Sequence, residues 1–145
     1  MHLSTKGRYA VMAMTDLAGR DGAGAVTLAE IAARQEISLS YLEQLFARLR
    51  RKGLVKSTRG PGGGYRLAKA AAETRIVDIV RAVDEPLHAT RCGGHASVGC
   101  MSKGERCLTH DLWAEMGRQV QDYLASVSLA DVVAGRLRPN AAVAA

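Results

Sequence analysis

Hydrophobic residues along the first half of the chain recur at three- and four-residue steps, the period of helices that bury one face. This pattern predicts a first helix over about residues 5–19 and a second over about residues 28–35, where residues 27–30 form a capping box. A third helix is predicted to begin after Ser38 or Ser40. Its apolar residues follow the i, i+3, i+4, i+7 pattern: Leu42, Leu45, Phe46 and Leu49. Two short helices joined by a tight turn, the second polar on its outer face, predict a helix-turn-helix.

A stretch of alternating residues follows the third helix. Residues 54–59 and 65–67 alternate as strands do, and the glycine-rich run 60–64 joins them. A hairpin directly after a helix-turn-helix is typical of the wing of a winged helix. The glycines form either a flexible turn or a tip slim enough to enter a DNA groove. Arg59 beside the turn favours the second interpretation, because a narrow minor groove attracts arginine.

The second half of the chain predicts further helices around a polar segment. Residues 74–83 carry an apolar face and precede Pro86, which cannot continue a helix. From residue 112 onward, apolar side chains return at helical spacing and predict a helix of about four turns. Its apolar stripe would pack on its own domain or on a second chain. We favour a homodimer, because a long helix beside a DNA-binding module is typical of dimerisation. Ser128 caps a last short helix that ends at Gly135.

These elements predict a mostly α protein with a small β wing, a winged helix-turn-helix domain plus a long C-terminal dimerisation helix. With one Phe, one Trp and four Tyr, its core must be mostly aliphatic. In order along the chain, we expect a DNA-binding domain over residues 1–84, a cysteine-rich metal- or cluster-binding loop over 85–111, the dimerisation helix and short terminal helix over 112–135, and a disordered tail over 136–145.

The balance of charge suggests a partner for this fold. Lys and Arg outnumber Asp and Glu by 20 to 14, a formal net charge of +6, which favours a polyanionic partner. Between Gln44 and Ala72 there are eight basic residues and no acidic one. A merely solvated surface would mix the two signs, so this density beside a helix-turn-helix indicates contacts with the phosphates of double-stranded DNA.

No apolar run is long enough to span a membrane, and the first residues lack the apolar core of a secretory signal. We therefore expect a cytoplasmic protein with no membrane partner.

The outer face of the third helix and the tip of the wing supply the predicted DNA contacts. Gln44 can present its amide to adenine, and Glu43 can accept a hydrogen bond from the amino group of cytosine. A carboxylate near phosphates is repelled unless it meets such a donor, so Glu43 would also penalise other sequences. Its alternative role is to complete a capping box with Ser40. The predicted DNA-binding residues are Ser38, Ser40, Tyr41, Glu43, Gln44, Arg48, Arg50, Arg59, Gly60, Pro61, Gly62, Gly63 and Tyr65.

Every cysteine of the chain lies in one polar segment. Cys92, Cys100, Cys107 and His110 follow the spacing C-x7-C-x6-C-x2-H. An odd number of cysteines in a reducing compartment argues against a disulfide framework and for metal or redox chemistry. Three thiolates and an imidazole suit tetrahedral zinc or an iron–sulfur cluster, and the wide spacing favours the cluster, with redox-active thiols third. No acid–base constellation accompanies them, so we expect neither catalytic residues nor an enzyme.

Several runs of the sequence carry a family resemblance. They are S-T-K-G-R-Y-A-V-M-A-M near the start, I-S-L-S-Y-L-E-Q-L-F-A-R-L-R in the third helix, V-K-S-T-R-G-P-G-G-G-Y in the wing, and A-V-D-E, A-T-R-C and C-L-T-H-D-L-W further on. Over roughly residues 1–135 the chain resembles the IscR-type iron–sulfur cluster regulators. The resemblance implies a homodimeric winged-helix transcription factor in which Glu43 restricts the accepted class of operator. It also implies a 2Fe–2S cluster bound by Cys92, Cys100, Cys107 and His110.

Two positions depart from the family pattern. The cysteine spacing is longer than the family's C-x5-C-x5-C, and related iron and nitric-oxide sensors with variable spacing hold 4Fe–4S clusters, so a 4Fe–4S cluster is the alternative. Glu36 stands where the turn of the motif usually has glycine, and a left-handed conformation there would cost about 1 kcal/mol.

The sequence thus predicts a DNA-binding regulator of genes for iron–sulfur cluster assembly and iron homeostasis. Its DNA binding would be controlled by the cluster, and the cluster assembly machinery would be the donor. The alternatives are a related iron- or nitric-oxide-sensing repressor with a 4Fe–4S cluster, or a zinc or redox metalloprotein.

Overall fold

The protein was analysed as a computed structural model, which describes residues 3–90, 92 and 99–137. Its elements are α1 (Thr5–Gly19), α2 (Leu28–Gln35), α3 (Leu39–Arg51), β1 (Val55–Thr58), β2 (Gly64–Leu67), the 3-10 turn η1 (Ala71–Glu73), α4 (Ile76–Ala82), α5 (His110–Ser126) and α6 (Leu129–Ala134). The predicted fold class, mostly helical with a small antiparallel sheet, is confirmed. Most of the predicted disordered tail, residues 138–145, lies outside the described residues, as do Arg91 and residues 93–98 of the cysteine-rich segment.

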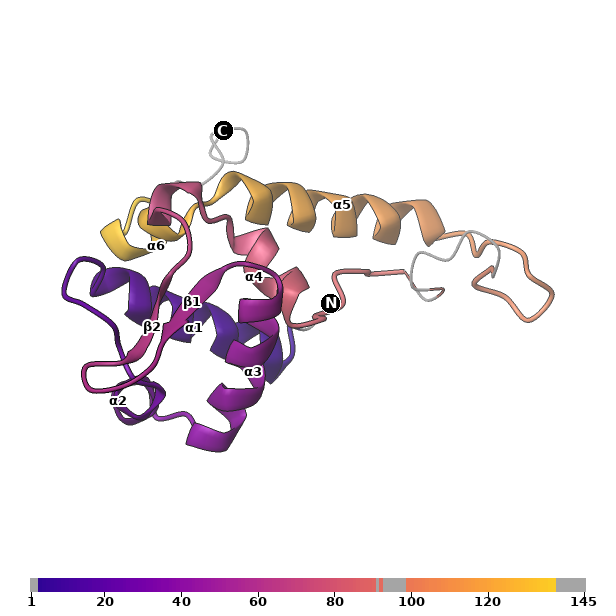
Figure 1. The fold of residues 1–145 in the computed structure, drawn as a ribbon. Helices are drawn as coiled ribbons and strands as arrows, with labels where there is room; N and C mark the ends of the chain where they lie inside the picture. The colour runs from indigo at the N-terminus through magenta and orange to yellow at the C-terminus, as the bar shows by residue number, and fades with distance from the viewer. Residues whose placement is uncertain (1–2, 91, 93–98, 138–145) are drawn as a thin grey trace.

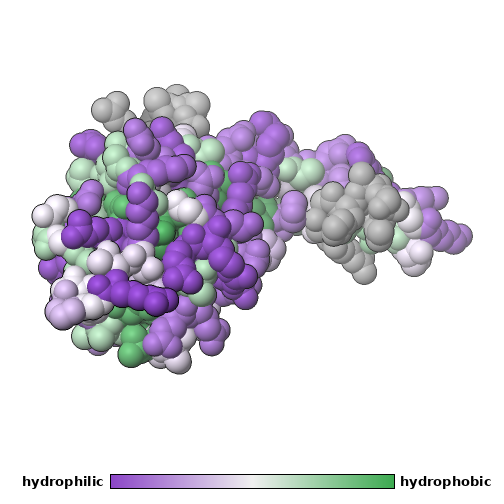
Figure 2. Space-filling model, viewed as in Figure 1, coloured by the Kyte–Doolittle hydropathy of each residue, from purple (hydrophilic) through white to green (hydrophobic). Residues whose placement is uncertain are grey.

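Helices α1 to α4, the wing and α6 form a globular part, and α5 extends from it together with residues 99–109 (Figure 1). In the view of Figure 2, hydrophilic side chains cover most of both parts, with small hydrophobic patches between them. None of the helices in the described part of the chain has the length and apolar content that a membrane crossing requires.

The core is aliphatic around a single phenylalanine, as the composition predicted. Its largest fully buried side chains come from α1 to α4 and α6: Phe46, Met14, Ile31, Leu42, Leu45, Leu49, Ile79, Leu129, Val80 and Val83. The i, i+3, i+4, i+7 stripe of α3 is therefore its buried face, which leaves the opposite polar face in solvent.

The turn between α2 and α3 settles where the second helix of the motif begins. The Ser38 hydroxyl accepts a hydrogen bond from the Tyr41 N–H at 3.2 Å, so Ser38 rather than Ser40 is the N-cap. Ile37 is buried beneath the turn. Glu36 has φ 55° and ψ 44°, the left-handed conformation that glycine adopts most easily. Its strain of about 1 kcal/mol is the cost of a non-glycine residue at this turn.

The wing is fixed to the rest of the domain by backbone and ring contacts. Strand β2 pairs with β1 in antiparallel register, with Tyr65 opposite Ser57. The Tyr65 backbone also exchanges two hydrogen bonds with Val26, at 2.9 and 2.7 Å, and its ring meets Phe46 edge-on at 4.9 Å. At the tip, a Cβ on Gly63 would lie 2.4 Å from the Thr58 carbonyl oxygen, so only glycine fits there.

Helix α5 leaves the domain along α4. The Ile76 N–H donates to the Val127 carbonyl at 3.0 Å, and the Leu129 N–H donates to the Thr74 carbonyl at 2.8 Å. Further along, Arg81 donates to the Gln121 side chain at 3.0 Å. These bonds hold the C-terminal half of α5 against the domain, while its N-terminal half lies beyond α4 (Figure 1).

Candidate metal centre and nucleic-acid interface

Three potential metal ligands meet where the cysteine-rich segment enters α5. The ligand atoms of Cys92, Cys100 and His110 all lie within 4.8 Å of one another. The Nδ1 atom of His110 is 3.0 Å from the Cys100 sulfur and 3.7 Å from the Cys92 sulfur. His110 is the first residue of α5, so the helix fixes the position of its ring. Cys100 is buried, and the other two are half-buried.

Cys107 is not one of these three clustered ligands. Its sulfur lies 3.7 Å from the Thr109 hydroxyl, and its backbone carbonyl accepts a hydrogen bond from the His110 N–H at 3.1 Å. The hydrogen bond to Thr109 lowers the pKa of the Cys107 thiol, which favours the thiolate that binds metals. A backbone hydrogen bond at Cys107 lowers the pKa of the Cys100 thiol, but burial and the neighbouring thiols raise it above its ordinary value overall.

The donor set fits a soft metal centre. Two thiols and an imidazole converge, a third thiol lies three residues before the histidine, and no carboxylate belongs to the described group. Thiolate and imidazole donors suit zinc and iron–sulfur clusters, whereas magnesium and calcium require oxygen ligands. The residues present therefore fit the predicted cluster, and the choice of all four ligands stays a prediction.

Residues 86–90, which we call the strap, carry the chain from α4 to Cys92. Leu87 packs on Val77 and Val80 of α4, and the strap then runs close to α5. A Cβ on the buried Gly117 would lie 3.4 Å from both the Ala89 nitrogen and the Leu87 carbonyl oxygen. Glycine in α5 thus lets the strap lie directly against the helix.

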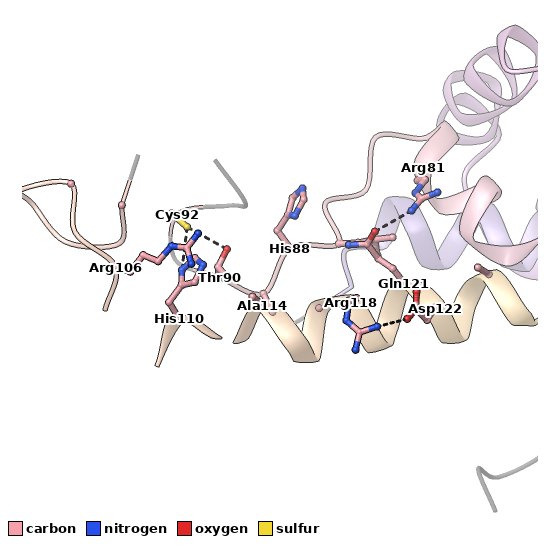
Figure 3. A pocket seen from close by; sticks show the side chains of 16 residues that line it. Arg81, His88, Thr90, Cys92, Arg106, His110, Ala114, Arg118, Gln121 and Asp122 are labelled. Atoms are coloured by element: carbon pink, nitrogen blue, oxygen red, sulfur yellow. Dashed lines mark hydrogen bonds and ion pairs between the residues drawn. The ribbon is translucent and has the colours of Figure 1, made fainter. Parts of the chain in front are cut away.

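A cavity of about 470 Å³ lies between the strap and α5. Cys92 and His110 face each other at one end of it, and Arg81 with Gln121 lies at the other (Figure 3). The metal-binding end is therefore continuous with the contact between α4 and α5.

Two acidic residues just before the strap contact α1 and α3. We call Asp84 and Glu85 the junction. Arg48 of α3 lies 3.0 Å from the Asp84 carboxylate and donates to the Val83 carbonyl at 3.2 Å. Asp84 itself has φ 58°, a left-handed conformation in a non-glycine residue.

Glu85 caps the first turn of α1. Glu85 is 5% exposed, and its carboxylate accepts the Ser4 N–H at 2.9 Å, the Gly7 N–H at 3.1 Å and the Ser4 hydroxyl. Ser4 occupies the N-cap position, but its hydroxyl donates to Glu85 and makes no capping bond. Burial alone would raise the pKa of the Glu85 carboxyl, but these hydrogen bonds outweigh it and hold the pKa below its ordinary value.

The junction was not predicted as functional. The run A-V-D-E contributed only to the resemblance. Adjacent acids after a helix are typical of a solvent-exposed surface, so the local sequence carries no signal for these contacts.

Several predicted DNA-binding residues gather in one groove. It measures about 620 Å³ and lies between the start of α1 and the turn before α3. Ser38, Ser40, Tyr41 and Gln44 line it, together with Thr5, Tyr9, Glu36 and Ile37, which the sequence did not indicate. The Tyr41 ring meets Tyr9 edge-on at 5.9 Å, so it is partly held by α1. Glu43 and Arg50 are exposed on α3, and residues 59–62 are exposed at the wing tip, with Gly63 half-buried.

Two predicted DNA-binding side chains are engaged within the protein. Arg48 pairs with Asp84, and Tyr65 packs on Phe46. Arg50 lies 3.5 Å from the Ser57 hydroxyl and so connects α3 with the wing. All three contacts join different elements of the fold, which helical spacing alone could not reveal.

Comparison with known proteins gives one consistent result. The model of the Rrf2 family, described as iron-dependent transcriptional regulators, matches residues 3–135. The regulator IscR of Photorhabdus laumondii is 53% identical over 133 residues, which cover 92% of this chain and 79% of that protein. IscR of Serratia proteamaculans is also 53% identical, with the same coverage.

Solved structures agree with this match. The structure of T. potens IscR is 35% identical, has a TM-score of 0.75, and the match covers 100% of this chain and 97% of that one. CymR, described as the global cysteine regulator of B. subtilis, is 34% identical with a TM-score of 0.75 and covers 92% and 97% of the two chains.

Proposed function

Because this chain belongs to the Rrf2 family of transcriptional regulators, we propose that an iron–sulfur cluster controls which operators it binds. The chain is a helix-turn-helix regulator and not an enzyme, as the sequence predicted. The convergence of the Cys92, Cys100 and His110 ligand atoms within 4.8 Å carries this proposal.

Cys92, Cys100, Cys107 and His110 are the proposed ligands. Four protein ligands complete the coordination of a 2Fe–2S cluster, which is the cofactor we favour. When bound, such a cluster supplies a redox-active charge and ties the four ligands together. A histidine ligand binds iron less firmly than a fourth thiolate would, and it makes binding of the cluster dependent on pH. That suits a sensor better than a purely structural site.

The strap and the junction give the ligands a physical connection to α1 and to the recognition helix α3. Cys92 lies two residues after the strap. The junction immediately precedes the strap, and there Glu85 bonds the first turn of α1 and Asp84 pairs with Arg48 of α3. Fixing Cys92 restrains the strap, so the orientation of α1 and α3 can differ between the cluster-bound and cluster-free states.

For DNA binding, we assign base contacts to the exposed polar face of α3 and a minor-groove contact to Arg59. Arg48 and Tyr65 would act mainly by holding α3 and the wing in place, because their side chains are already engaged.

The exposed apolar side chains of α5 support a homodimer. Leu112, Trp113 and Tyr123 are exposed on a helix whose N-terminal half lies beyond the domain. A second copy would bury them, and each dimer would present two copies of α3 to an operator with two half-sites.

From the resemblance to IscR, we propose genes of iron–sulfur cluster assembly and iron homeostasis as targets, and the cluster assembly machinery as cluster donor in the cytoplasm.

The experiment is anaerobic purification with iron, acid-labile sulfide and zinc analysis and a visible absorption spectrum. About two irons and two sulfides per chain with charge-transfer absorption are expected for a 2Fe–2S cluster. About four of each would instead favour the 4Fe–4S alternative. Cys92→Ala is the matched control and should lose both iron and colour. Colourless wild-type protein with stoichiometric zinc would contradict the proposal.

A further inference from the structure

One apolar side chain on the predicted DNA-binding face is substantially exposed. Among the described residues of the first 84, only Met12 and Leu39 are large hydrophobics with substantial exposure, at 38% and 43%. Leu39 is the first residue of α3 and directly follows the Ser38 cap. In the described part of the chain, Leu39 is not among the side chains packed against the core. The exposed part of a leucine adds little to the stability of the fold, which leaves it available for an apolar contact outside the protein.

The neighbours of Leu39 are the predicted base-reading residues. Ser40 follows it in the chain, and Glu43 lies one turn further along on the same side of the helix. Residues four apart in a helix are separated by about 6 Å along its axis. Base pairs are about 3.4 Å apart, so these two side chains would meet bases one or two steps apart.

We propose that Leu39 contacts the C5-methyl group of a thymine in the major groove and so determines specificity. The thymine methyl is the one apolar feature that a base presents in that groove, and apolar side chains recognise it by excluding water. Glu43 on the same side accepts from the amino group of a cytosine. The pair therefore selects a thymine one or two base steps from that cytosine. This inference rests on the proposed function, since it requires α3 to enter the major groove.

The test removes only the C5-methyl group of thymine from the operator. Operators are first selected from a random double-stranded DNA library by wild-type protein. Each thymine of a selected operator is then replaced by deoxyuridine, which keeps every hydrogen-bonding group, and dissociation constants are measured for wild type and Leu39→Ala. The matched control is Met12→Ala, which removes the other exposed apolar side chain of this half of the protein.

For wild type, deoxyuridine in place of the contacted thymine of one half-site should weaken binding about fourfold, the effect of losing one buried methyl group. Leu39→Ala should bind the unmodified operator more weakly and should no longer respond to deoxyuridine at that position. Met12→Ala should keep the wild-type response. The inference is overturned if no thymine shows a methyl effect, or if Leu39→Ala keeps the same effect. If wild-type protein selects no operator, the proposed function fails and this inference falls with it.

Discussion

Replacing Glu85 by glutamine tests whether the junction holds α1 to the strap. The substitution keeps the shape of the side chain and removes its charge. In the folded protein the carboxylate accepts two backbone N–H groups, of Ser4 and Gly7, and the Ser4 hydroxyl. A glutamine offers only one acceptor oxygen and turns an NH2 group toward those donors.

The hydrogen bonds of Glu85 determine how much unfolding free energy the substitution should remove. Hydrogen bonds to charged groups contribute about 1.5–3 kcal/mol each, against about 1 kcal/mol for neutral pairs. A difference of about 1 kcal/mol over two or three bonds predicts that Glu85→Gln lowers the free energy of unfolding by about 2–3 kcal/mol at neutral pH. For a chain of this size, that corresponds to a fall in melting temperature on the order of 10 °C.

The difference in unfolding free energy between wild type and Glu85→Gln should also depend on pH. Because the folded-state pKa of Glu85 is held below its ordinary value, the unfolded chain binds the proton more readily. The stabilisation is therefore fully present above the ordinary glutamate pKa of about 4.3 and disappears as the pH falls through the folded-state pKa. The gap between wild type and Glu85→Gln should close in acid, where both side chains are neutral.

Urea unfolding followed by circular dichroism, at neutral pH and in steps into acid, measures both effects. The control is Glu73→Gln, which changes an exposed glutamate and should have little effect. Equal unfolding free energies for wild type and Glu85→Gln at neutral pH, or a gap that stays constant in acid, would refute the reasoning.

Three further substitutions test other parts of the account. Arg59→Ala should weaken binding to all operators alike, as measured by fluorescence anisotropy. The slope of log affinity against log salt concentration should fall by about 1 for each phosphate that the protein no longer neutralises. An effect confined to some operators would contradict this. Glu43→Ala should broaden the set of operators selected from a random library, whereas an unchanged set would leave its capping role as the better explanation. Glu36→Gly should raise the free energy of unfolding by about 1 kcal/mol, because it removes the left-handed strain at this position. A variant that is less stable than wild type in thermal unfolding would contradict this explanation.

Much of the DNA-binding half could be predicted from local sequence. The buried stripe of α3 and the capping box before α2 depend on residues three and four apart, and both occur where spacing placed them. The sequence also indicated that Glu36 replaces a glycine of the motif, and the structure shows the left-handed conformation whose cost was considered there. Local patterns succeed here because helices and their caps are local structures.

The contacts that connect the two halves could not be predicted in the same way. Glu85 is 81 residues from Ser4, and Asp84 is 36 residues from Arg48. An acidic residue after a helix is usually exposed, and only the packing of α1 against α4 encloses Glu85. At the metal centre, spacing identified candidate ligands, but the fold decides which sulfur atoms approach His110. The structure brings Cys92 and Cys100 to that ring.

The most direct test of the account compares operator preference with and without the cluster. Dissociation constants for a panel of selected operators would be measured anaerobically for cluster-loaded wild type, cluster-free wild type and Cys92→Ala. The account predicts that all three bind DNA, that the loaded protein prefers different operators from the cluster-free protein, and that Cys92→Ala behaves as the cluster-free form. Identical affinities and preferences in all three would contradict control of DNA binding by the cluster.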